Sequence, residues 1–473
     1  VTRHVYAQPI NPPEALRPEP AGATKKQGWL EAVRDGIAEE MRANPTIQYF
    51  GEGIGERGGS FAHTKNLFQE FGAQRMVDTP ISEQGFTAAA IGASAIGART
   101  VADLMFADFC FEAAGQIILQ AAKLRYMSNG EMKAPVVIRV GAGALRSAGP
   151  HHSGSYHPVF AHMPGLVVCL PSTPADAKGL MKTALRAGDP VVMLEPKALF
   201  SSKGEVPVGE YYVPFGVART VRRGSDITIV ATGQLVAEAE KAAAVLSLEG
   251  IEAEIIDPRT IMPFDIDAVV ESVRRTHRLL IADEAWAMCG LGAEIAQSIN
   301  ELAFDDLDAP PARLHTSPTS HPFAPALERA MLVNAEKIAA AARSVIAGIA
   351  PVPDHWHGQR REVPVSAAGK PAVHAVVSAP APAPQRAPLA AEDAGGDVAI
   401  KMPYGDLTVS EGTLVGWRLK VGDKVKAGDT IAEIETDKTV VEIEAPISGT
   451  LSRIDTPVGT VVPMGGRIGG ISP

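Results

Sequence analysis

The chain has 473 residues and a formal net charge of −10, and 46% of its residues are hydrophobic. At the usual ~150 residues per domain, this length suggests about three domains with ample apolar material for their cores. The acidic balance argues against nucleic acid as a general partner and against binding to a membrane surface through basic residues. Only 3 residues are cysteine, which excludes a disulfide scaffold and favours a reducing compartment.

The first residues carry no apolar stretch after their basic residues, so no secretory signal is expected. Residues 1–24 are rich in Pro and are expected to form an extended segment. The sequence has no run of about 18 apolar residues of the kind that spans a membrane. The nearest run, Thr87–Ala98, is short and rich in Ala and Gly, and it predicts a tightly packed helix. We therefore expect a cytoplasmic protein.

Between residues 25 and 350, short β-rich runs alternate with helical patterns, which predicts an α/β fold with mostly parallel sheets. Several runs are apolar throughout, as is typical of parallel strands that are buried on both faces. A break at Leu199–Pro214 divides this region into expected domains at 25–205 and 206–350. The runs include Ile47–Phe50, Val136–Val140, Leu166–Leu170, Val191–Leu194, Ile227–Ala231, Ile255–Asp257 and Leu279–Ala282.

The composition changes sharply in residues 351–396. Within this stretch, Ser366–Ala394 is rich in Ala and Pro and contains no aromatic residue. Such a segment buries too little apolar surface to offset the entropy of ordering it. It is either a plain disordered connector or a semi-rigid tether that lets the last domain travel. We favour the tether, because a small complete domain is expected to follow at 397–473.

The last domain contains an internal repeat. Gly412-Thr413-Leu414 recurs 37 residues later as Gly449-Thr450-Leu451, and further Val, Gly and Ile positions match in the same register. Two such copies predict a small all-β domain, in which two similar four-strand sheets pack as a flattened barrel. Lys438 lies between the copies, in a stretch that predicts a hairpin with this lysine at its tip.

A single surface lysine is usually only solvated, but the repeat around Lys438 resembles the lipoyl/biotinyl carrier family over Asp397–Ser472. The neighbours Asp437 and Thr439 favour the lipoyl form, since biotin carriers typically place Met on each side of the lysine. The resemblance implies covalent lipoate on Lys438, attached by a lipoate ligase or a lipoyl transferase. A long arm on a tether suits visits to several active sites, because tethering raises the local concentration.

Several motifs occur in one order in the region before the linker. Together they resemble the beta subunit of the thiamine-diphosphate-dependent decarboxylase component of 2-oxo acid dehydrogenase complexes, from about Lys25 to Gly348. The pyruvate, branched-chain and acetoin versions match alike. The second domain resembles the transketolase C-terminal domain. The motifs of the first domain are Asp78–Phe86, Asp103–Phe109, Ala121–Asn129, His151–Tyr156, Met163-Pro164-Gly165 and Pro171–Gly179.

This resemblance assigns roles to four residues. Glu83 matches the glutamate that donates a proton to the pyrimidine ring of the cofactor, a task for a buried carboxyl group; alone, it would be read as a helix cap. Phe109 matches the aromatic residue against the pyrimidine face, and Glu52 matches a glutamate on the cofactor side of the first strand. His152 matches a histidine that handles protons while the acyl group passes to lipoate. The alternatives are core packing for Phe109 and a structural or metal-binding role for the histidines.

In this family the thiamine diphosphate lies between two subunits, and the alpha subunit binds the diphosphate and magnesium through Gly-Asp-Gly. The printed sequence contains no Gly-Asp-Gly, so we expect a separate alpha subunit and a heterotetramer. An acyltransferase core and a dihydrolipoyl dehydrogenase complete the expected complex. The resemblance also implies a potassium site. Its residues would be Val136, Ala184, Ala187 and Asp189.

The sequence therefore predicts an oxidoreductase of the pyruvate dehydrogenase type that carries its own lipoyl domain. Oxidative decarboxylation of a 2-oxo acid and reductive acylation of the lipoyl group would be its reactions. Acetoin cleavage by the same residues is an alternative, and Glu195-Pro196-Lys197 leans slightly toward the branched-chain and acetoin forms. A third hypothesis is a non-catalytic carrier or scaffold in which only Lys438 functions.

Overall fold

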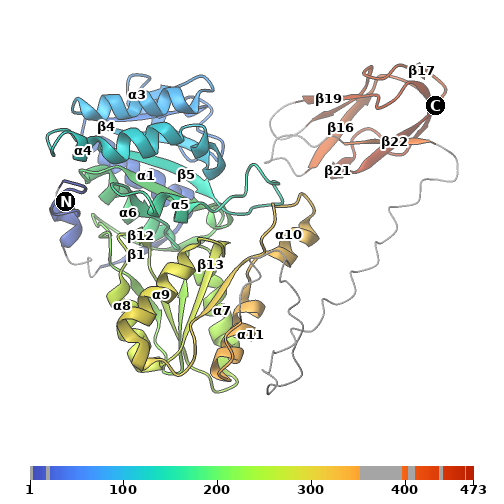
Figure 1. Ribbon diagram of the computed structural model, residues 1–473. Coiled ribbons are helices and arrows are strands. Elements are labelled where there is room, and N and C mark those ends of the chain that lie inside the picture. Colours follow the sequence, from blue (N-terminus) through green and yellow to red (C-terminus); the bar gives the residue numbers. More distant parts are fainter. Residues whose placement is uncertain (1–3, 18–21, 352–396, 403–410, 436–439, 464) are drawn as a thin grey trace. The chain divides into compact units, whose positions relative to one another are not determined.

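The computed structural model describes residues 4–17, 22–351, 397–402, 411–435, 440–463 and 465–473. The chain divides into two compact units, at residues 1–365 and 366–473. In Figure 1 the first unit consists of helices packed around sheets, and the second consists of strands. In the described part of the chain, no helix has both the length and the hydropathy that a membrane span requires.

The first sheet of the first unit has the order β12-β6-β7-β5-β4-β2-β3, and its strands are parallel except where β12 meets β6. Successive residues of β5 alternate between two apolar clusters: Val136 and Ile138 face one, and Val137 faces the other. Both faces are buried, which explains the continuously apolar runs. The strands are β2 (Ile47–Gly51), β3 (Met76–Asp78), β4 (Arg99–Phe106), β5 (Val136–Ala142), β6 (Val167–Cys169), β7 (Val191–Pro196) and β12 (Thr260–Met262).

Helices cover both faces of this sheet. Trp29 of α1 and Leu180 of α6 lie in one cluster, and Phe86 of α3 and Ile117 of the π-helix η3 lie in the other. The helix expected at Thr87–Ala98 is confirmed by α3, which begins at Glu83. The segments are α1 (Trp29–Ala43), α2 (Leu67–Phe71), α3 (Glu83–Ala95), η2 (Ala107–Phe111), η3 (Gly115–Ala121), α4 (Ala122–Met127), α5 (His157–Ala161), α6 (Pro174–Arg186) and η4 (Lys197–Leu199).

The second sheet has the order β14-β13-β10-β11-β9, with only its edge strand β9 antiparallel. Helices α7 and α11 pack on one face of this sheet, and α8 and α9 pack on the other. The elements are β9 (Arg219–Arg222), β10 (Ile227–Ala231), α7 (Leu235–Ser247), β11 (Ala253–Asp257), α8 (Ile266–Thr276), β13 (Leu279–Trp286), α9 (Leu291–Ala303), η5 (Phe304–Asp306), β14 (Ala312–Thr316), α10 (Pro325–Met331) and α11 (Ala335–Ile346).

The Pro-rich start of the chain packs on the first unit. Its described part contains a short 3-10 helix, η1 (Pro13–Leu16), for which proline at the first position is preorganised. The Asn11 side chain forms two hydrogen bonds with the backbone of Phe215, at 2.7 and 3.0 Å. The break expected at Leu199–Pro214 contains β8 (Lys203–Pro207), which pairs antiparallel with β1 (Thr24–Gly28). This segment is therefore a packed part of the unit.

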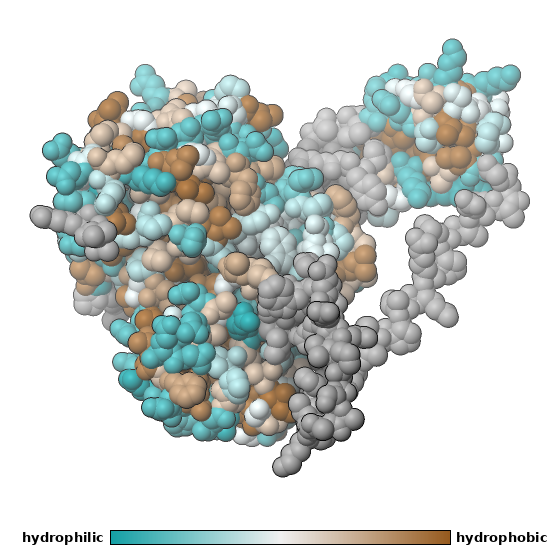
Figure 2. Space-filling view, in the orientation of Figure 1, coloured by the Kyte–Doolittle hydropathy of each residue, from teal (hydrophilic) through white to brown (hydrophobic). Residues whose placement is uncertain are grey.

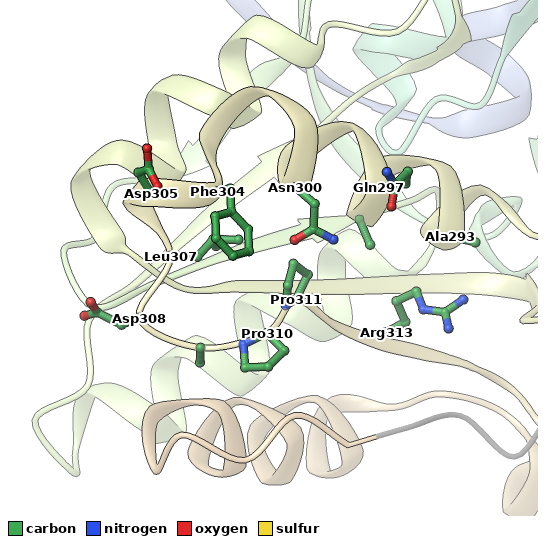
Figure 3. Close-up of a pocket in the computed structure, with 12 residues that line it drawn as sticks. Ala293, Gln297, Asn300, Phe304, Asp305, Leu307, Asp308, Pro310, Pro311 and Arg313 are labelled. Carbon is green, nitrogen blue, oxygen red and sulfur yellow. The ribbon is translucent and has the colours of Figure 1, made fainter.

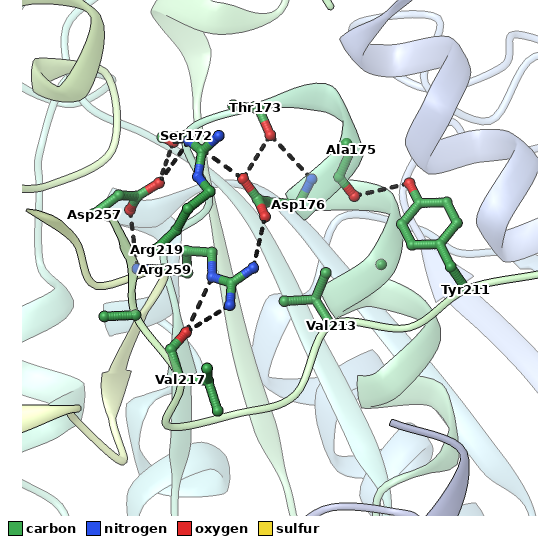
Figure 4. A network of polar contacts seen from close by, with 12 residues as sticks. Ser172, Thr173, Ala175, Asp176, Tyr211, Val213, Val217, Arg219, Asp257 and Arg259 are labelled. Atoms are coloured by element: carbon green, nitrogen blue, oxygen red, sulfur yellow. Dashed lines mark hydrogen bonds and ion pairs between the residues drawn. The ribbon is translucent and has the colours of Figure 1, made fainter. Parts of the chain in front are cut away.

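A buried polar network joins the two α/β halves (Figure 4). Asp257, at the end of β11, accepts hydrogen bonds from Ser172 and, at 3.1 Å, from Arg219. Asp176 of α6 accepts a hydrogen bond of 3.1 Å from Arg259. Strand β12 of the second half also pairs with β6 of the first sheet. The two halves are therefore fixed to each other by hydrogen bonds and ion pairs, and they form one rigid support for the loops between them.

The second unit has the predicted repeat architecture. Its described strands form antiparallel sheets in the orders β15-β22-β20-β17 and β19-β18-β16-β21. Residues at matching positions of the two copies fill one core, among them Leu414 with Leu451 and Ile434 with Ile471. The strands are β15 (Val398–Lys401), β16 (Glu411–Trp417), β17 (Lys424–Val425), β18 (Thr430–Glu435), β19 (Val440–Glu444), β20 (Gly449–Ile454), β21 (Val461–Pro463) and β22 (Arg467–Ser472).

We predict that Asp257→Asn changes the pH dependence of stability. Burial and the nearby Asp176 charge raise the pKa of Asp257 from 3.8 to about 6. The folded state therefore favours the protonated carboxyl group of Asp257. The stabilisation from this protonation is fully present below about pH 4, and it is lost as the pH rises through about 6. Thermal unfolding should therefore show the parent losing stability relative to Asp257→Asn between about pH 4 and 6. A constant difference in Tm over that range would contradict this assignment.

Candidate functional site

Three carboxylates lie near the carboxyl ends of strands β2 and β3. Glu52 directly follows β2, Asp78 is the last residue of β3, and Glu83 opens α3. Strands β2 and β3 are parallel neighbours, with Gly51 opposite Asp78, so their carboxyl ends meet at one edge. The backbone N–H of Gly55 donates to Asp78 Oδ2 at 3.2 Å, which ties the loop after β2 to β3.

The electrostatics of this edge favour a proton on Glu52. Partial burial raises the pKa of Glu52, the negative charges of Glu83 and Asp78 raise it further, and Arg57 opposes them. The structure therefore brings together Glu52 and Glu83, which the sequence analysis named separately. Glu83 is only half-buried in the single chain, whereas a buried carboxyl was expected. The exposed Ile81 lies two residues before it, so this edge is open in the absence of another subunit.

The structure also brings Phe109 and His152 together. Phe109 lies in η2 and His152 in the loop between β5 and α5, and their ring centroids are 5.5 Å apart at 72°. Phe106 packs edge-on against both rings, at 5.4 and 4.7 Å. Such edge-to-face contacts are favourable and directional. The rings therefore form a fixed aromatic platform beside a titratable imidazole.

His152 favours its neutral form. Partial burial lowers the pKa of His152, and the positive charge of Lys197 lowers it further, while Asp108 opposes them. A neutral imidazole can accept a proton and pass it on at near-neutral pH. Of the histidines that crowd this region of the sequence, His157 pairs instead with Asp283 at 2.9 Å. Among the described residues, no group of three or more His, Cys, Asp or Glu could hold a metal ion.

A chain of buried charges lies under these loops. Asp103 of β4 accepts hydrogen bonds from Tyr49 and from His63, the latter at 2.7 Å. Arg139 of β5 donates to Tyr49 at 2.9 Å and to Glu195 at 2.5 Å. Burial alone would raise the pKa of Asp103, but His63 and Arg139 hold it well below its usual range. His63 belongs to the loop that carries Glu52, so this network fixes that loop to the sheet.

The sequence analysis missed Asp103, His63, Arg139 and Lys197 as supporting residues. A signal for two of them was present, because Asp103 and Arg139 interrupt apolar strands. A charge inside a buried strand is costly unless it is paired. The identity of the partners came only from the fold, since His63 and Asp103 are 40 residues apart in sequence.

The residues predicted to bind potassium already contact donors of the chain. The carbonyl of Ala187 accepts a hydrogen bond of 2.6 Å from the Arg99 guanidinium. The Asp189 carboxylate accepts from Arg125 at 2.6 Å and from the Ala7 N–H at 2.7 Å. A backbone carbonyl has two lone pairs, so it can accept a second partner beside such a donor. The potassium site therefore stays a prediction.

Lys438 lies outside the described residues. The strands on either side are described, and β18 pairs antiparallel with β19 up to Glu435 opposite Val440. This pairing places the two ends of the undescribed stretch 436–439 on neighbouring strands.

An open hollow of about 720 Å³ lies elsewhere, in the second half of the first unit (Figure 3). It lies beside α9 and the segment leading into β14, and none of the candidate site residues Glu52, Glu83, Phe109 and His152 lines it. Arg313, Asn300 and Gln297 supply polar groups there. The sequence analysis did not predict this hollow, because nothing in its residue pattern marks a cavity.

The chain matches three family models in order. These are "Transketolase, pyrimidine binding domain" over residues 25–202, "Transketolase, C-terminal domain" over 216–338 and "Biotin-requiring enzyme" over 398–471. Among solved structures, a split-gene transketolase described as an inactive beta4 tetramer matches with a TM-score of 0.53 at 24% identity. It covers 69% of this chain and 99% of that one, and at this identity it supports the fold alone.

Curated relatives match more closely. The beta subunit of acetoin:2,6-dichlorophenolindophenol oxidoreductase from Cupriavidus necator is 44% identical, over 67% of this chain and 96% of its own length. The pyruvate dehydrogenase E1 beta subunit of Rhizobium meliloti is 43% identical, over 67% of this chain and 69% of its own. The 2-oxoisovalerate dehydrogenase beta subunit of Bacillus subtilis is 39% identical, over 67% and 98%.

The fold and the three matches define a transketolase-like thiamine enzyme subunit joined to a carrier domain of the biotin/lipoyl type. More specifically, the chain belongs to the beta subunits of the E1 component of 2-oxo acid dehydrogenases and their acetoin relatives. It is thus an oxidoreductase subunit, and the sequence-based assignment of the family is confirmed. The matches support thiamine diphosphate and a covalently attached lipoate as its cofactors.

We predict that Asp103→Asn lowers the free energy of unfolding by about 3 kcal/mol, because it leaves buried partners uncompensated. Urea denaturation measures this change. Arg42→Gln serves as the control, since the Arg42–Glu70 pair is exposed and its loss should cost less than about 1 kcal/mol. Equal effects of the two substitutions would contradict a supporting role for the buried network.

Proposed function

We propose that this chain is the beta subunit of a pyruvate dehydrogenase-type complex, and that it contributes half of an active site and its own lipoyl acceptor. The observation that carries the proposal is one edge of the first sheet. At this edge, Glu52 and Glu83 lie near each other. The segments that follow the neighbouring strands β4 and β5 at the same edge carry Phe109 and His152, whose rings are in contact. The substrate is a 2-oxo acid, and the products are carbon dioxide and an acylated dihydrolipoyl group.

The chemistry of these residues fits an aminopyrimidine ring. Such a ring offers nitrogen atoms that bond to carboxyl groups and a flat face that packs on an aromatic side chain. Glu83 and Glu52 supply the carboxyl groups, and Phe109 supplies a half-buried ring. When bound, thiamine diphosphate supplies the electron sink that allows the bond to the substrate carboxylate to break.

Glu83 holds a proton against the pyrimidine ring nitrogen and thereby activates the cofactor. Glu52 lies close enough that the two charges interact, and one proton between them would lower their repulsion. Covering this edge with another subunit removes water, which favours the neutral carboxyl. The composite site thus supplies the burial that the single chain lacks.

His152 handles protons during acyl transfer to the lipoyl disulfide. One sulfur of the disulfide receives the acyl group, and the other leaves as a thiolate that takes up one proton. The imidazole of His152 can take up a proton from water and then give it to the thiolate as imidazolium. Burial lowers the pKa of His152, which makes its imidazolium a stronger acid toward the thiolate. The two electrons of decarboxylation reduce the disulfide, so no further oxidant is required for this step.

The missing half of the site is assigned to an alpha subunit in a heterotetramer. Large apolar side chains are exposed beside α3 and in α4, with Ile81 75%, Ile96 89% and Met127 62% exposed. Figure 2 shows apolar side chains among hydrophilic ones on this end of the first unit. Exposed apolar groups of this size are typical of a surface that a protein partner covers. The alpha subunit would hold the diphosphate and magnesium, since the chain has no Gly-Asp-Gly.

Lys438 is the proposed site of lipoylation by a lipoate ligase or a lipoyl transferase. In the sequence it falls between the segments that form β18 and β19, and its neighbours Asp437 and Thr439 favour lipoate over biotin. The reduced arm would pass its acyl group to an acyltransferase core and be reoxidised by dihydrolipoyl dehydrogenase. The proposed compartment is the cytoplasm, because the free cysteines suit a reducing environment.

Acetoin cleavage is the second candidate, favoured by the 44% identity to an acetoin oxidoreductase beta subunit. The same Glu83 and Phe109 would serve either substrate, since both reactions use the same electron sink. A carrier without catalysis is disfavoured, because the residues assigned to the site are present, Glu52 lies near Glu83 and Phe109 contacts His152. The potassium site stays part of the proposal through the resemblance alone, with Val136, Ala184, Ala187 and Asp189 as its residues.

We predict that Glu83→Gln, assembled with the alpha subunit, lowers dye-linked decarboxylation about 100-fold or more, because an amide cannot supply the proton. Reduction of 2,6-dichlorophenolindophenol with pyruvate, a branched-chain 2-oxo acid and acetoin measures the rate and identifies the substrate. Glu31→Gln, which changes a glutamate of α1, serves as the control. Full activity of Glu83→Gln would overturn the mechanism.

We predict that Lys438→Arg keeps dye-linked decarboxylation and loses acylation of its own chain, because the dye bypasses the lipoyl arm. The intact mass of the parent should show one lipoyl group, which is absent from the variant. A biotin group at this lysine would contradict the carrier assignment. Loss of decarboxylation in the variant would contradict the separation of the two tasks.

A further inference from the structure

The loop that carries His152 is held by charged side chains from outside it. It spans residues 143–156, between β5 and α5. The ammonium of Lys197, from η4, donates to the carbonyl of Gly143 and, at 2.8 Å, to the carbonyl of His152 itself. Lys197 is 1% exposed. One buried cation therefore joins the start of the loop to the residue that carries the imidazole.

Lys197 also supports the aromatic platform under His152. Its Nζ lies 5.3 Å from the centroid of the Phe106 ring, and the Phe106 ring packs 4.7 Å from that of His152. A cation over an aromatic face is attracted by the ring quadrupole, more strongly when it is desolvated. The same side chain thus fixes the backbone of His152 and the ring against which its imidazole rests.

Two carboxylates of the second half hold the loop from the other side. Glu284 of β13 accepts a hydrogen bond of 2.9 Å from the N–H of Ala144. Glu328 of α10 accepts from both the N–H and the hydroxyl of Ser147, each at 3.0 Å. Asp108 accepts from the N–H of Gly154 at 3.2 Å. The second half therefore binds the loop at two separate residues, Ala144 and Ser147.

The backbone of the loop needs this support. Arg146 and Ser147 both have positive φ, 51° and 54°, a conformation that is strained for residues other than glycine. Gly143 also has positive φ, and a Cβ there would lie 2.6 Å from the Glu284 carboxylate. Such a loop keeps one conformation only while its partners hold it, so loss of a partner should displace His152.

We propose that Lys197, together with Glu284 and Glu328, positions His152 for acyl transfer to the lipoyl group. This role goes beyond structural support by the second half, because it links that half to the reacting histidine. The inference rests on the proposed function of His152. None of the three residues is placed against the substrate or the cofactor, so they act through the loop.

The carboxylates also keep Lys197 charged. Burial lowers the pKa of Lys197 to about 8, while Asp108, Glu284 and Glu328 oppose the shift. Lys197 is the largest cationic influence on His152, and His151 is a smaller one. As the pH rises through about 8, the ammonium loses its charge, and the hold on the loop should weaken.

The test compares two activities of the complex assembled with the alpha subunit. Dye-linked decarboxylation reports the chemistry at Glu83, and acylation of the lipoyl group reports the step at His152. We expect Lys197→Met to lower acylation about 10- to 100-fold, the loss that a small misplacement of a catalytic group produces. We expect dye-linked decarboxylation to fall less, so that the variant reproduces the pattern of His152→Ala. In the parent, the rate of acylation should fall as the pH rises through about 8, and in Lys197→Met this fall should be absent.

Lys178→Met is the matched control. Lys178 of α6 is also buried, and it pairs at 2.6 Å with Glu39 of α1, away from the loop. Its replacement should leave the ratio of the two activities unchanged. Equal falls in both activities for Lys197→Met, or an unchanged ratio, would overturn the inference. If the parent complex shows no decarboxylation, the proposed function itself fails.

Hydrogen exchange of the assembled complex gives a reading that needs no activity. Lys197→Met and Glu328→Ala should speed exchange within residues 143–156, because the first removes the donor to the carbonyls of Gly143 and His152 and the second removes the acceptor of the Ser147 N–H. Glu328→Ala also guards against misfolding of the lysine variant, since it leaves Lys197 in place. Unchanged exchange in this loop for both variants would overturn the inference.

Discussion

Buried charges at the carboxyl edge of the first sheet are the constraint on which the rest of the site depends. Asp103 with His63 fixes the loop of Glu52, and Lys197 with backbone carbonyls fixes the loop of His152. A buried charge is tolerated only when its partners are well placed. Each loop therefore has one low-energy arrangement. The absence of a Cβ at Gly143 leaves room for the Glu284 carboxylate. The parallel sheet brings the loops to one edge, and the charges decide how they lie.

The same constraint explains why the two α/β halves act together. Arg259 with Asp176, and Asp257 with Ser172, join them in the interior, and β12 extends the first sheet from the second half. Glu284 and Glu328 then reach across to the loop of His152. The second half is thus more than a surface for other subunits. It completes the support of a residue that belongs to the first half.

The fold followed closely from the sequence because its signals are local. Continuous apolar runs identified the parallel strands, and the repeat between Gly412 and Gly449 identified the paired sheets of the carrier domain. The resemblance supplied Glu83, Phe109 and His152, and the structure brings two of them into contact. The roles of Lys197 and Glu328 were not predictable, because these residues meet the loop across 45 and 181 residues of chain. The expected burial of Glu83 was not met, since Glu83 is only half-buried in the single chain.

The central claim is that this chain holds half of an active site together with the acceptor of its product. The most direct test is the intact mass of the chain after mixing with the alpha subunit and pyruvate, a branched-chain 2-oxo acid or acetoin. The account predicts a gain of one acyl group on the lipoylated chain, and only when the alpha subunit and a substrate are both present. Acylation without the alpha subunit would contradict it, as would no acylation with any of the three substrates.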